Sequence, residues 1–263
     1  MRHSALNHTL VAAALLAAFA PLASAQTISA TPDNALGISQ FVGAGGEWQT
    51  TLFIVNLSNS AEDFTMNFYD DAGLPKFMPI DTLGTVSKIT ATLAAGQTLR
   101  YVTGAAPTLQ VAWALLVPAT PATARLAGFA VFRQTVPSGP STVSSEGVVD
   151  LTSVTESKYV LMYDNLAGPV TTAMFANPDP FNSLTIFAEI RDEQGAVLSA
   201  DSIILPPFGH TAFVLTDRFP ATANRRGSIR FNASPKGFTG LGFRFSPFGT
   251  FTSFRLLTSK DIQ

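Results

Sequence analysis

Short runs in which apolar and polar residues alternate cover much of the chain. Between residues 184 and 191 the apolar positions Leu184, Ile186, Ala188 and Ile190 alternate with Thr185, Phe187, Glu189 and Arg191. Phe64, Met66 and Phe68 alternate with the residues between them in the same way. A period of two is typical of a strand with one buried face. Because Gly, Pro, Asn and Asp interrupt the runs at short intervals, the pattern predicts an all-β chain built from hairpins.

The pattern of one part of the chain returns in another part. Residues 68–73 (FYDDAG) match residues 190–195 (IRDEQG). The other matched pairs are Thr50-Thr51 with Thr171-Thr172, Asn56 with Asn177, Gly96-Gln97-Thr98 with Gly209-His210-Thr211, Thr103 with Thr216, Pro107 with Pro220, and Gly128-Phe129 with Gly240-Leu241. The order of the pairs is kept, and the first copy has an insertion near residues 75–87. Repeats of this length predict tandem domains related by an internal duplication.

The repeat also predicts the domain boundaries. We expect a flexible lead over residues 26–35, one β-sandwich domain over 36–151, a linker over 152–156 and a second β-sandwich domain over 157–260. The strands expected in the second copy are 158–163, 171–176, 184–191, 197–205, 211–215, 227–232, 239–245 and 251–257. Seven or eight short strands in about 100 residues are typical of immunoglobulin-like or fibronectin-like sandwiches. The phenylalanines expected in the cores are Phe64, Phe68, Phe213, Phe231 and Phe243.

The N-terminus has the pattern of a secretory signal peptide over residues 1–25. Arg2 precedes an apolar run from Leu10 to Ala20, and the small residues Ala23 and Ala25 follow. The run is too short to span a bilayer, and the small residues fit signal-peptidase specificity. We therefore expect cleavage after Ala25 and export to the periplasm or the extracellular space. Since the chain has no cysteine, we expect no lipid anchor, and no later apolar run is long enough to predict membrane insertion.

Composition excludes several classes of protein. The 263 residues are 46% hydrophobic and 13% charged, which is unlike a disordered chain. The absence of cysteine excludes disulfide scaffolds, thiolate metal sites and cysteine nucleophiles. The formal net charge of -2 indicates no general attraction to nucleic acid.

Several segments resemble a family of exported bacterial proteins. The segments are Gly45-Gly46-Glu47-Trp48-Gln49-Thr50, Tyr163-Asp164-Asn165, Arg191-Asp192-Glu193-Gln194-Gly195, Gly209-His210-Thr211-Ala212-Phe213, and Arg226-Gly227 followed by Gly240-Leu241-Gly242-Phe243-Arg244-Phe245. The family consists of uncharacterised tandem β-sandwich proteins. The resemblance implies export and a paired β-domain layout, and it implies no reaction, ligand or catalytic residue.

His210 is the only histidine outside the predicted signal peptide. A Ser-His-Asp hydrolase would need it as the base, but the chain contains no Gly-x-Ser-x-Gly elbow. Gln97 fills the matching position in the first copy, and Gln cannot act as a general base. We interpret His210 as a structural residue at a turn, and we predict no catalytic residue, no metal site and no cofactor.

The segments Asp70-Asp71-Ala72-Gly73 and Asp192-Glu193-Gln194-Gly195 place carboxylates close together. A calcium site needs six or more oxygen ligands, which these segments do not supply. We interpret both as hairpin turns in which the first Asp accepts backbone hydrogen bonds and the Gly takes a positive φ.

The candidate ligand-binding residues are Trp48, Tyr69, Arg225 and Arg226. Exposed aromatic rings can stack on sugars, and Tyr69 should point outward from its strand. Trp48 has a second interpretation, packing under its glycine-rich segment, and Trp113 lies in a run apolar enough for a core. The second copy is the more basic one, with Arg218, Arg225, Arg226, Arg230 and Lys236. These residues form either a solvated loop face or a site for an anionic glycan.

The sequence thus favours an exported non-enzymatic β-sandwich protein that acts as a surface, matrix or adhesion/binding module. The alternative is a carbohydrate-binding protein that uses exposed aromatics or the basic loops of the second domain. A hydrolase of unknown class is the third hypothesis. The sequence identifies no partner; the candidates are a glycan and another surface protein, and nucleic acid is not expected.

Overall fold

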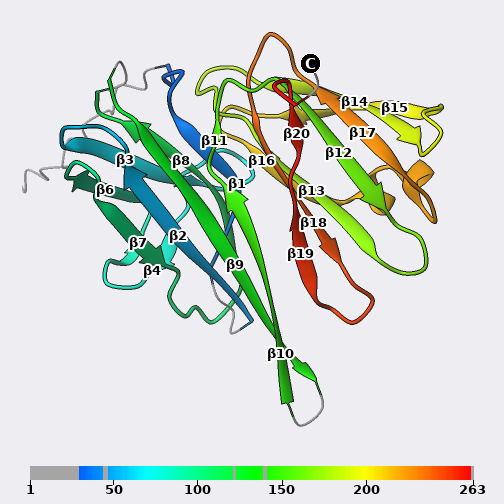
Figure 1. Ribbon diagram of the computed structural model, residues 1–263, viewed down its shortest axis with the longest axis horizontal. Coiled ribbons are helices and arrows are strands. Elements are labelled where there is room, and N and C mark those ends of the chain that lie inside the picture. The colour runs from blue at the N-terminus through cyan, green and yellow to red at the C-terminus, as the bar shows by residue number, and fades with distance from the viewer. Residues whose placement is uncertain (1–29, 44–46, 121–122, 139–140, 262–263) are drawn as a thin grey trace, which may run out of the picture.

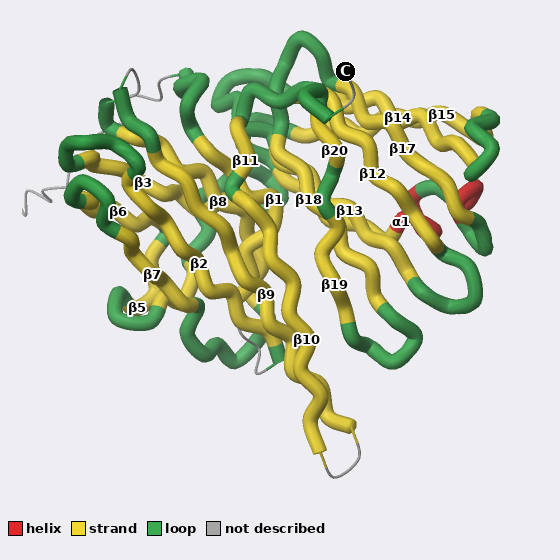
Figure 2. The backbone as a smooth tube through the Cα atoms, in the orientation of Figure 1, coloured by secondary structure: helices red, strands yellow, loops and turns green. Residues whose placement is uncertain are grey.

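The computed structural model describes residues 30–43, 47–120, 123–138 and 141–261, and nearly all of its regular structure is β-strand (Figure 1). The predicted signal peptide over residues 1–25 lies outside the described residues. Two short helical segments, α1 (Leu215–Arg218) and η1 (Pro220–Thr222), follow one another after a strand of the second half (Figure 2). The expectation of an all-β chain is therefore confirmed.

The first half of the molecule contains two larger antiparallel sheets. Sheet I consists, in order, of β11 (Thr152–Ser153), β1 (Leu36–Gly43), β8 (Gln110–Pro118), β3 (Glu62–Tyr69) and β6 (Lys88–Leu93). Sheet II consists of β10 (Ser141–Asp150), β9 (Leu126–Ser138), β2 (Trp48–Asn56) and β7 (Thr98–Val102). Their facing sides pack into one apolar cluster, in which Phe64 and Phe68 of sheet I meet Leu52 and Phe132 of sheet II.

The second half has the same order of strands. Sheet III consists of β20 (Leu257–Thr258), β12 (Lys158–Asp164), β17 (Arg226–Asn232), β14 (Leu184–Asp192) and β15 (Val197–Leu205). Sheet IV consists of β19 (Phe251–Phe254), β18 (Thr239–Phe245), β13 (Val170–Ala176) and β16 (His210–Val214). All eight strand segments expected for this half are present, and the eighth divides into β19 and β20. A second core cluster fills the space between sheets III and IV, with Tyr159, Phe175 and Phe231 as its large residues.

The insertion expected in the first half forms a small hairpin of its own. It consists of β4 (Met78–Ile80) and β5 (Gly84–Val86), which pair with each other. Met78 and Ile80 are buried and join the first core cluster. The second half has no strands at the corresponding place between β14 and β15 in the described chain.

The strand order differs from that of an immunoglobulin constant domain. In that domain the first two strands share a sheet. Here β1 and β2 lie in different sheets, as do β12 and β13, and the first strand of each half pairs with a later strand, β8 or β17. What is common to both is the architecture of two packed antiparallel sheets.

Four of the five phenylalanines expected in the cores are buried: Phe64, Phe68, Phe231 and Phe243. Phe213 is only half-buried, because it lies on β16, which is an edge strand of sheet IV. Phe243 is buried in the first core cluster rather than the second, beside Phe132 of the first half, with ring centroids 5.2 Å apart. The two halves therefore share apolar packing.

Strand β18 explains how sheet IV packs on both of its faces. All residues from Thr239 to Phe243 are buried. A side chain at Gly240 or Gly242 would meet Phe175 or Leu161 of the second core, so glycine lets these strands approach closely. Leu241 and Phe243 project from the other face and pack with residues of the first half.

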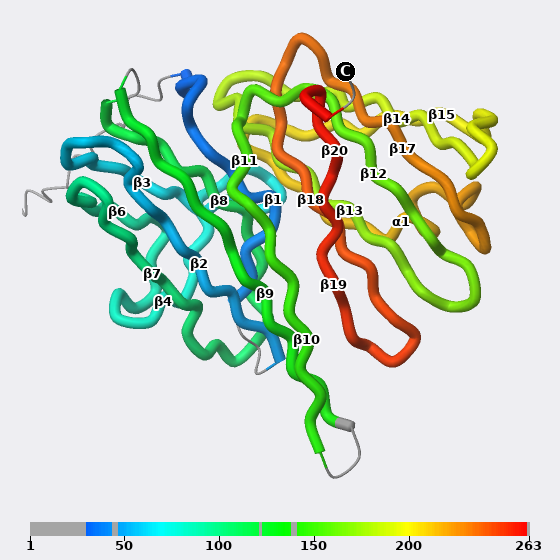
Figure 3. The backbone as a smooth tube through the Cα atoms, viewed as in Figure 1, coloured from blue at the N-terminus to red at the C-terminus, as the bar shows by residue number. Residues whose placement is uncertain are grey.

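The segments expected to be flexible or to link the halves are partly ordered. Within the predicted lead, Ala35 is fully buried, and the Thr31 hydroxyl donates a hydrogen bond to the Pro178 carbonyl over 2.6 Å. Within the predicted linker, residues 152–153 form β11, which pairs with β1. Strands β10 and β19 lie side by side where the halves meet (Figure 3), joined by the Ser253 hydroxyl and the Val148 carbonyl at 2.9 Å.

Candidate functional site

Tyr69, a predicted ligand-binding residue, packs against two aromatic rings. Its ring stacks on Phe208 of the second half with centroids 4.4 Å apart, and on Trp113 with centroids 5.3 Å apart. The Trp113 indole donates a hydrogen bond to the Phe208 carbonyl oxygen over 2.6 Å. Burial raises the pKa of Tyr69 to about 12. Tyr69 does point away from the core of its own half, but its ring packs on Trp113 of the same half and on Phe208 of the second half rather than being left open for a sugar.

Trp48, the second predicted aromatic, also lies where the halves meet. Its ring centroid is 5.0 Å from that of Phe251 and 6.3 Å from that of Phe245, both in the second half. The glycines under which it was expected to pack, Gly45 and Gly46, lie outside the described residues. Trp48 is half-buried against the first core cluster, so its contacts are those of a packing residue.

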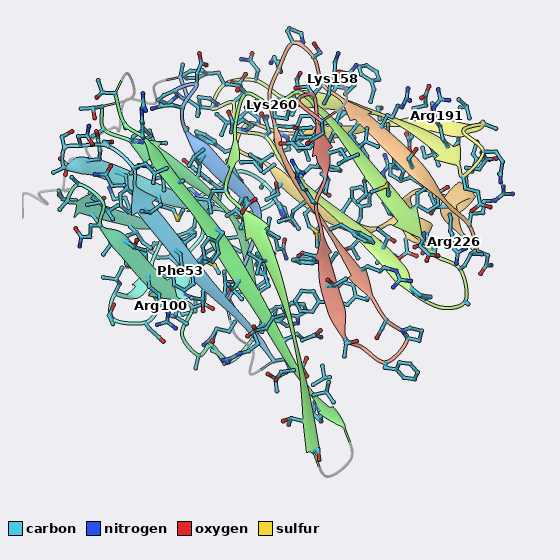
Figure 4. All side chains as sticks on the ribbon, viewed as in Figure 1. Phe53, Arg100, Lys158, Arg191, Arg226 and Lys260 are labelled. Atoms are coloured by element: carbon cyan, nitrogen blue, oxygen red, sulfur yellow. The ribbon has the colours of Figure 1, made fainter. Side chains whose placement is uncertain are left out.

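The predicted cations Arg225 and Arg226 are exposed in the second half. Arg226 forms a salt bridge with Asp164 at 3.1 Å, and Arg244 binds the other oxygen of the same carboxylate at 3.3 Å. Figure 4 shows Arg226 on the side of the second half remote from the first. The structure therefore does not bring the four predicted ligand-binding residues together.

His210 is buried and joins the two halves. Its Nδ1 lies 2.7 Å from Oδ1 of Asp71, whose side chain is 77% exposed. The hydrogen bond from His210 holds the pKa of the Asp71 carboxyl below its usual value, against a smaller opposing effect of burial. In a catalytic triad the other ring nitrogen bonds to the nucleophile. Nε2 of His210 has no hydrogen-bond partner in the described part of the chain.

The sequence match of His210 with Gln97 is wrong. The Asn56 amide donates to the Gln97 carbonyl, and the matching Asn177 amide donates to the Gly209 carbonyl. Gln97 therefore corresponds to Gly209, and Thr98 corresponds to His210. The sequence match failed because it aligned two glycines, Gly96 and Gly209, whereas the positive φ of Gly96 is matched by Phe208, with φ values of 71° and 53°.

The two carboxylate-rich segments are hairpin turns, as expected. In the first, Oδ1 of Asp70 accepts from the amides of Ala72 and Leu74, and φ of Gly73 is 82°. In the second, Oδ1 of Asp192 accepts from the amides two and four residues on, and φ of Gly195 is 84°. Within the described ranges, no three His, Asp or Glu side chains are grouped as metal ligands would be.

The outer face of sheet III carries an open depression of about 460 Å³. Phe187 of β14, 62% exposed, forms its apolar wall. Lys158 of β12 and Arg230 and Asn232 of β17 lie beside the ring, because β12, β17 and β14 are neighbours and their outward residues align. Figure 4 shows Lys158 on this part of the second half.

The depression is lined by two cations, Lys158 and Arg230, and by two anions, Glu189 and Asp201. Glu189 binds Arg191 at 2.6 Å, and this hydrogen bond holds the pKa of Glu189 below its usual value. Asp201 forms a salt bridge with Arg218 at 3.0 Å. In the described structure neither Lys158 nor Arg230 forms a salt bridge. Both anions thus bind arginines outside the depression. The charge of Arg230, which lies opposite Glu189, also lowers the pKa of Glu189, but Arg230 and Lys158 form no salt bridge of their own in the described structure.

A second hollow of about 460 Å³ lies between the segments 148–153 and 253–256. Its two aromatic residues are Tyr159 and Phe254, and both pack in or against the second core cluster. It therefore offers no free ring to a ligand, unlike the depression on sheet III.

Sequence reasoning missed Phe187 as a site residue, although the signal was present. The alternation over residues 184–191 places Phe187 on the polar face of its strand, where a phenylalanine is out of pattern. Lys158 and Asn232 gave no such signal, because only the pairing of β12, β17 and β14 brings them beside Phe187.

Comparison of the chain with protein-family models, with curated proteins and with solved structures finds no match in any of the three. In the part of the chain that the structure describes, no helix has the length and apolar character needed to cross a membrane.

Proposed function

We propose that the chain is an exported, non-enzymatic β-sandwich protein that acts as a surface, matrix or adhesion/binding module. We further propose that its halves are tandem domains related by an internal duplication, immunoglobulin-like or fibronectin-like at the level of two packed sheets. The identical strand orders of sheets I and III and of sheets II and IV support the duplication. The matched hydrogen bonds in the turns at Asp70 and Asp192 support it independently.

The ligand class we propose is an acidic glycan, bound on the outer face of sheet III. The observation that carries this proposal is the depression in which an exposed Phe187 ring stands beside two cations, Lys158 and Arg230, that form no salt bridge in the described structure. An aromatic ring can pack on the apolar face of a sugar, and the cations can bind its carboxylates. Asn232 adds an amide that can both donate to and accept from hydroxyl groups.

The test is the binding of a soluble polyuronate to the mature chain, compared with a neutral polysaccharide of similar length, by isothermal titration calorimetry. We expect binding of the polyuronate, and we expect Phe187→Ala and Arg230→Ala each to weaken it by about tenfold. Phe248→Ala is the matched control, because Phe248 is 89% exposed on the loop between β18 and β19 of the same half, away from β14.

Two results would contradict the acidic-glycan proposal. One is the absence of binding to any polyuronate at low salt. The other is binding that Arg230→Ala weakens but Phe187→Ala does not, since a ring that contributes nothing would leave only a general attraction between opposite charges. Circular dichroism of each variant would confirm that the fold is intact.

A further inference from the structure

The outer face of sheet II has an apolar centre that remains partly exposed in the described structure. Strand β2 alternates between buried residues such as Leu52 and half-exposed residues such as Phe53. The outward Phe53 and Phe129 rings stack with centroids 4.9 Å apart. Phe129 remains 38% exposed and Val148, on β10, 54% exposed. A sheet face turned to water usually carries polar residues, so this face has the composition of an interface.

The register of the four strands arranges this face in ordered rows. Phe53 lies opposite Arg100 on one side and opposite Phe129 on the other, and Phe129 lies opposite Asp150. One row across the sheet therefore runs cation, ring, ring, anion, from β7 at one edge to β10 at the other. Figure 4 shows Phe53 and Arg100 close together on β2 and β7.

The charged ends of this row are unpaired in the described structure. Arg100 and Asp150 are both exposed. Among the described residues, neither side chain forms a salt bridge or a hydrogen bond. The next row is Val102, Thr51, Val131 and Val148, of which Val102 is buried at the edge and Val148 is exposed. This row places uncharged residues beside the two rings.

Such a row is complementary to itself. A two-fold axis that lies in the interface, parallel to the strands and between β2 and β9, places β7 of one copy over β10 of the other. Arg100 of each copy then faces Asp150 of the other, and Phe53 of each copy faces Phe129 of the other. We propose that the outer face of sheet II is a homodimer interface in which two copies of this chain pack face to face through these residues. In a two-fold symmetric contact each pair of residues occurs twice, once with each copy contributing the first residue.

The second half already uses the corresponding face in this way. Met174 and Leu241 of sheet IV occupy the positions that Phe53 and Phe129 occupy in sheet II, since each pair lies directly opposite across two neighbouring strands. In the second half that face is covered by the first half, and Leu241 is buried. In the described structure the equivalent face of sheet II keeps exposed residues such as Phe129 and Val148, which a second copy would cover.

The size of the face sets the expected strength of the dimer. Four strands about 4.8 Å apart and about 26 Å long offer an area of about 500 Å² on each copy. This is below the roughly 800 Å² per partner of a standard stable interface. We therefore expect a dimer that forms reversibly with a dissociation constant of about 10 to 100 µM.

The experiment is sedimentation equilibrium of the mature chain between about 5 and 500 µM. We expect a monomer–dimer equilibrium that weakens with salt, because each dimer contains two Arg100–Asp150 pairs. Arg100→Asp alone and Asp150→Arg alone should each weaken dimerisation by about tenfold, since each places like charges opposite one another. The double variant Arg100→Asp/Asp150→Arg should restore it. Arg226→Asp is the control, because it changes the charge equally at a remote place.

The outcomes separate this interface from other kinds of association. A monomer at 500 µM would overturn the proposal. So would a dimer that the two single charge reversals leave unchanged, or one that the double variant fails to restore. Phe129→Ser should also weaken the dimer, and because all three charge variants alter exposed residues, the result does not depend on whether Phe129→Ser folds. Glycan binding on sheet III is measured separately and does not enter this test.

Discussion

The turns at residues 94–97 and 206–209 have the same backbone but different surroundings. In each, the fourth residue donates a hydrogen bond to the first, at 3.0 Å from Gln97 to Ala94 and at 2.9 Å from Gly209 to Pro206. The third residue has a positive φ in both. In the first half that residue is Gly96, and a side chain there would meet nothing within 4 Å. In the second half it is Phe208, whose ring and carbonyl contact Tyr69 and Trp113.

A positive φ is unfavourable for a bulky residue, by about 1 to 2 kcal/mol. Phe208 accepts this conformation where its ring stacks on Tyr69 and its carbonyl binds the Trp113 indole. The comparison shows that two equivalent turns diverge in sequence because only one of them lies between the halves. The contact between the halves is not symmetric, because the second half contributes the outer face of sheet IV and the first half contributes a different surface. The outer face of sheet II, which is the equivalent of sheet IV, is therefore not used in this contact.

The largest test of this asymmetry is to separate the halves. The sequence predicts that residues 155–263 alone form a cooperatively folded β-rich domain, and the second core cluster of this segment supports that expectation. The separated fragment would, however, expose Met174, Leu241 and Phe243, which the first half covers. We therefore expect circular dichroism to show a β-rich fold with a lower melting temperature than the full chain, and light scattering to show self-association. A monomeric fragment as stable as the full chain would show that the shared cluster contributes little.

Phe231 and Phe243 provide a finer version of the same comparison. Both are buried, but Phe231 belongs to the core within the second half and Phe243 to the cluster shared with the first. In the full chain, Phe231→Ala and Phe243→Ala should each lower the free energy of unfolding by about 3 to 5 kcal/mol, measured by urea denaturation. In the fragment, Phe243→Ala should cost less than about 1 kcal/mol, while Phe231→Ala should keep its full effect. Equal losses at Phe243 in both contexts would contradict the shared packing.

The strands of the second half could be predicted closely because alternation is a local signal, and β14 and β15 begin where the pattern begins. The contact between the halves could not be predicted in this way. Trp48 and Tyr69 are outward by periodicity, and periodicity does not distinguish a residue that faces water from one that faces another sheet. Residues 239–243 did carry a signal for a strand that faces another sheet. After Thr239 the segment contains only glycine and apolar residues, as expected for a strand buried on both faces.

The candidate site was predicted less well than the fold, for a related reason. Of the residues around the depression, Arg230 was noticed as part of a basic cluster, but its neighbours Lys158 and Phe187 come from strands far apart in the sequence. Their proximity depends on β17 lying between β12 and β14. That strand order is a property of the topology, which one sequence without its relatives does not specify.

Gly73 and Gly195 hold equivalent turn positions in the two halves, and in the described structure only the turn at Gly73 contacts the other half. Both have a positive φ, so an alanine at either position incurs the same backbone cost of about 1 kcal/mol. A Cβ at Gly73 would lie 2.0 Å from the Pro207 carbonyl oxygen, whereas a Cβ at Gly195 would meet nothing within 4 Å. We expect Gly195→Ala to lower the free energy of unfolding by about 1 kcal/mol and Gly73→Ala by about 2 to 4 kcal/mol. Equal losses would mean that the two halves do not meet at this turn.

The smallest expected effect comes from the Asp71–His210 pair, which also joins the halves. Because the pKa of Asp71 is lower in the folded chain than its usual value near 4, the pair stabilises the fold above about pH 4. That contribution disappears as the pH falls through the folded-state pKa and the carboxyl takes up a proton. Since Asp71 is largely exposed, solvent screening keeps the contribution below about 1 kcal/mol.

Asp71→Asn should therefore be less stable than the unmodified chain at pH 7, by urea denaturation, and the difference should vanish at pH 2 to 3. Glu193→Gln is the matched control, because Glu193 holds the equivalent turn position, where the described structure places no histidine. An Asp71→Asn effect that persists unchanged at low pH would show that the charge of Asp71 is not what connects it to His210.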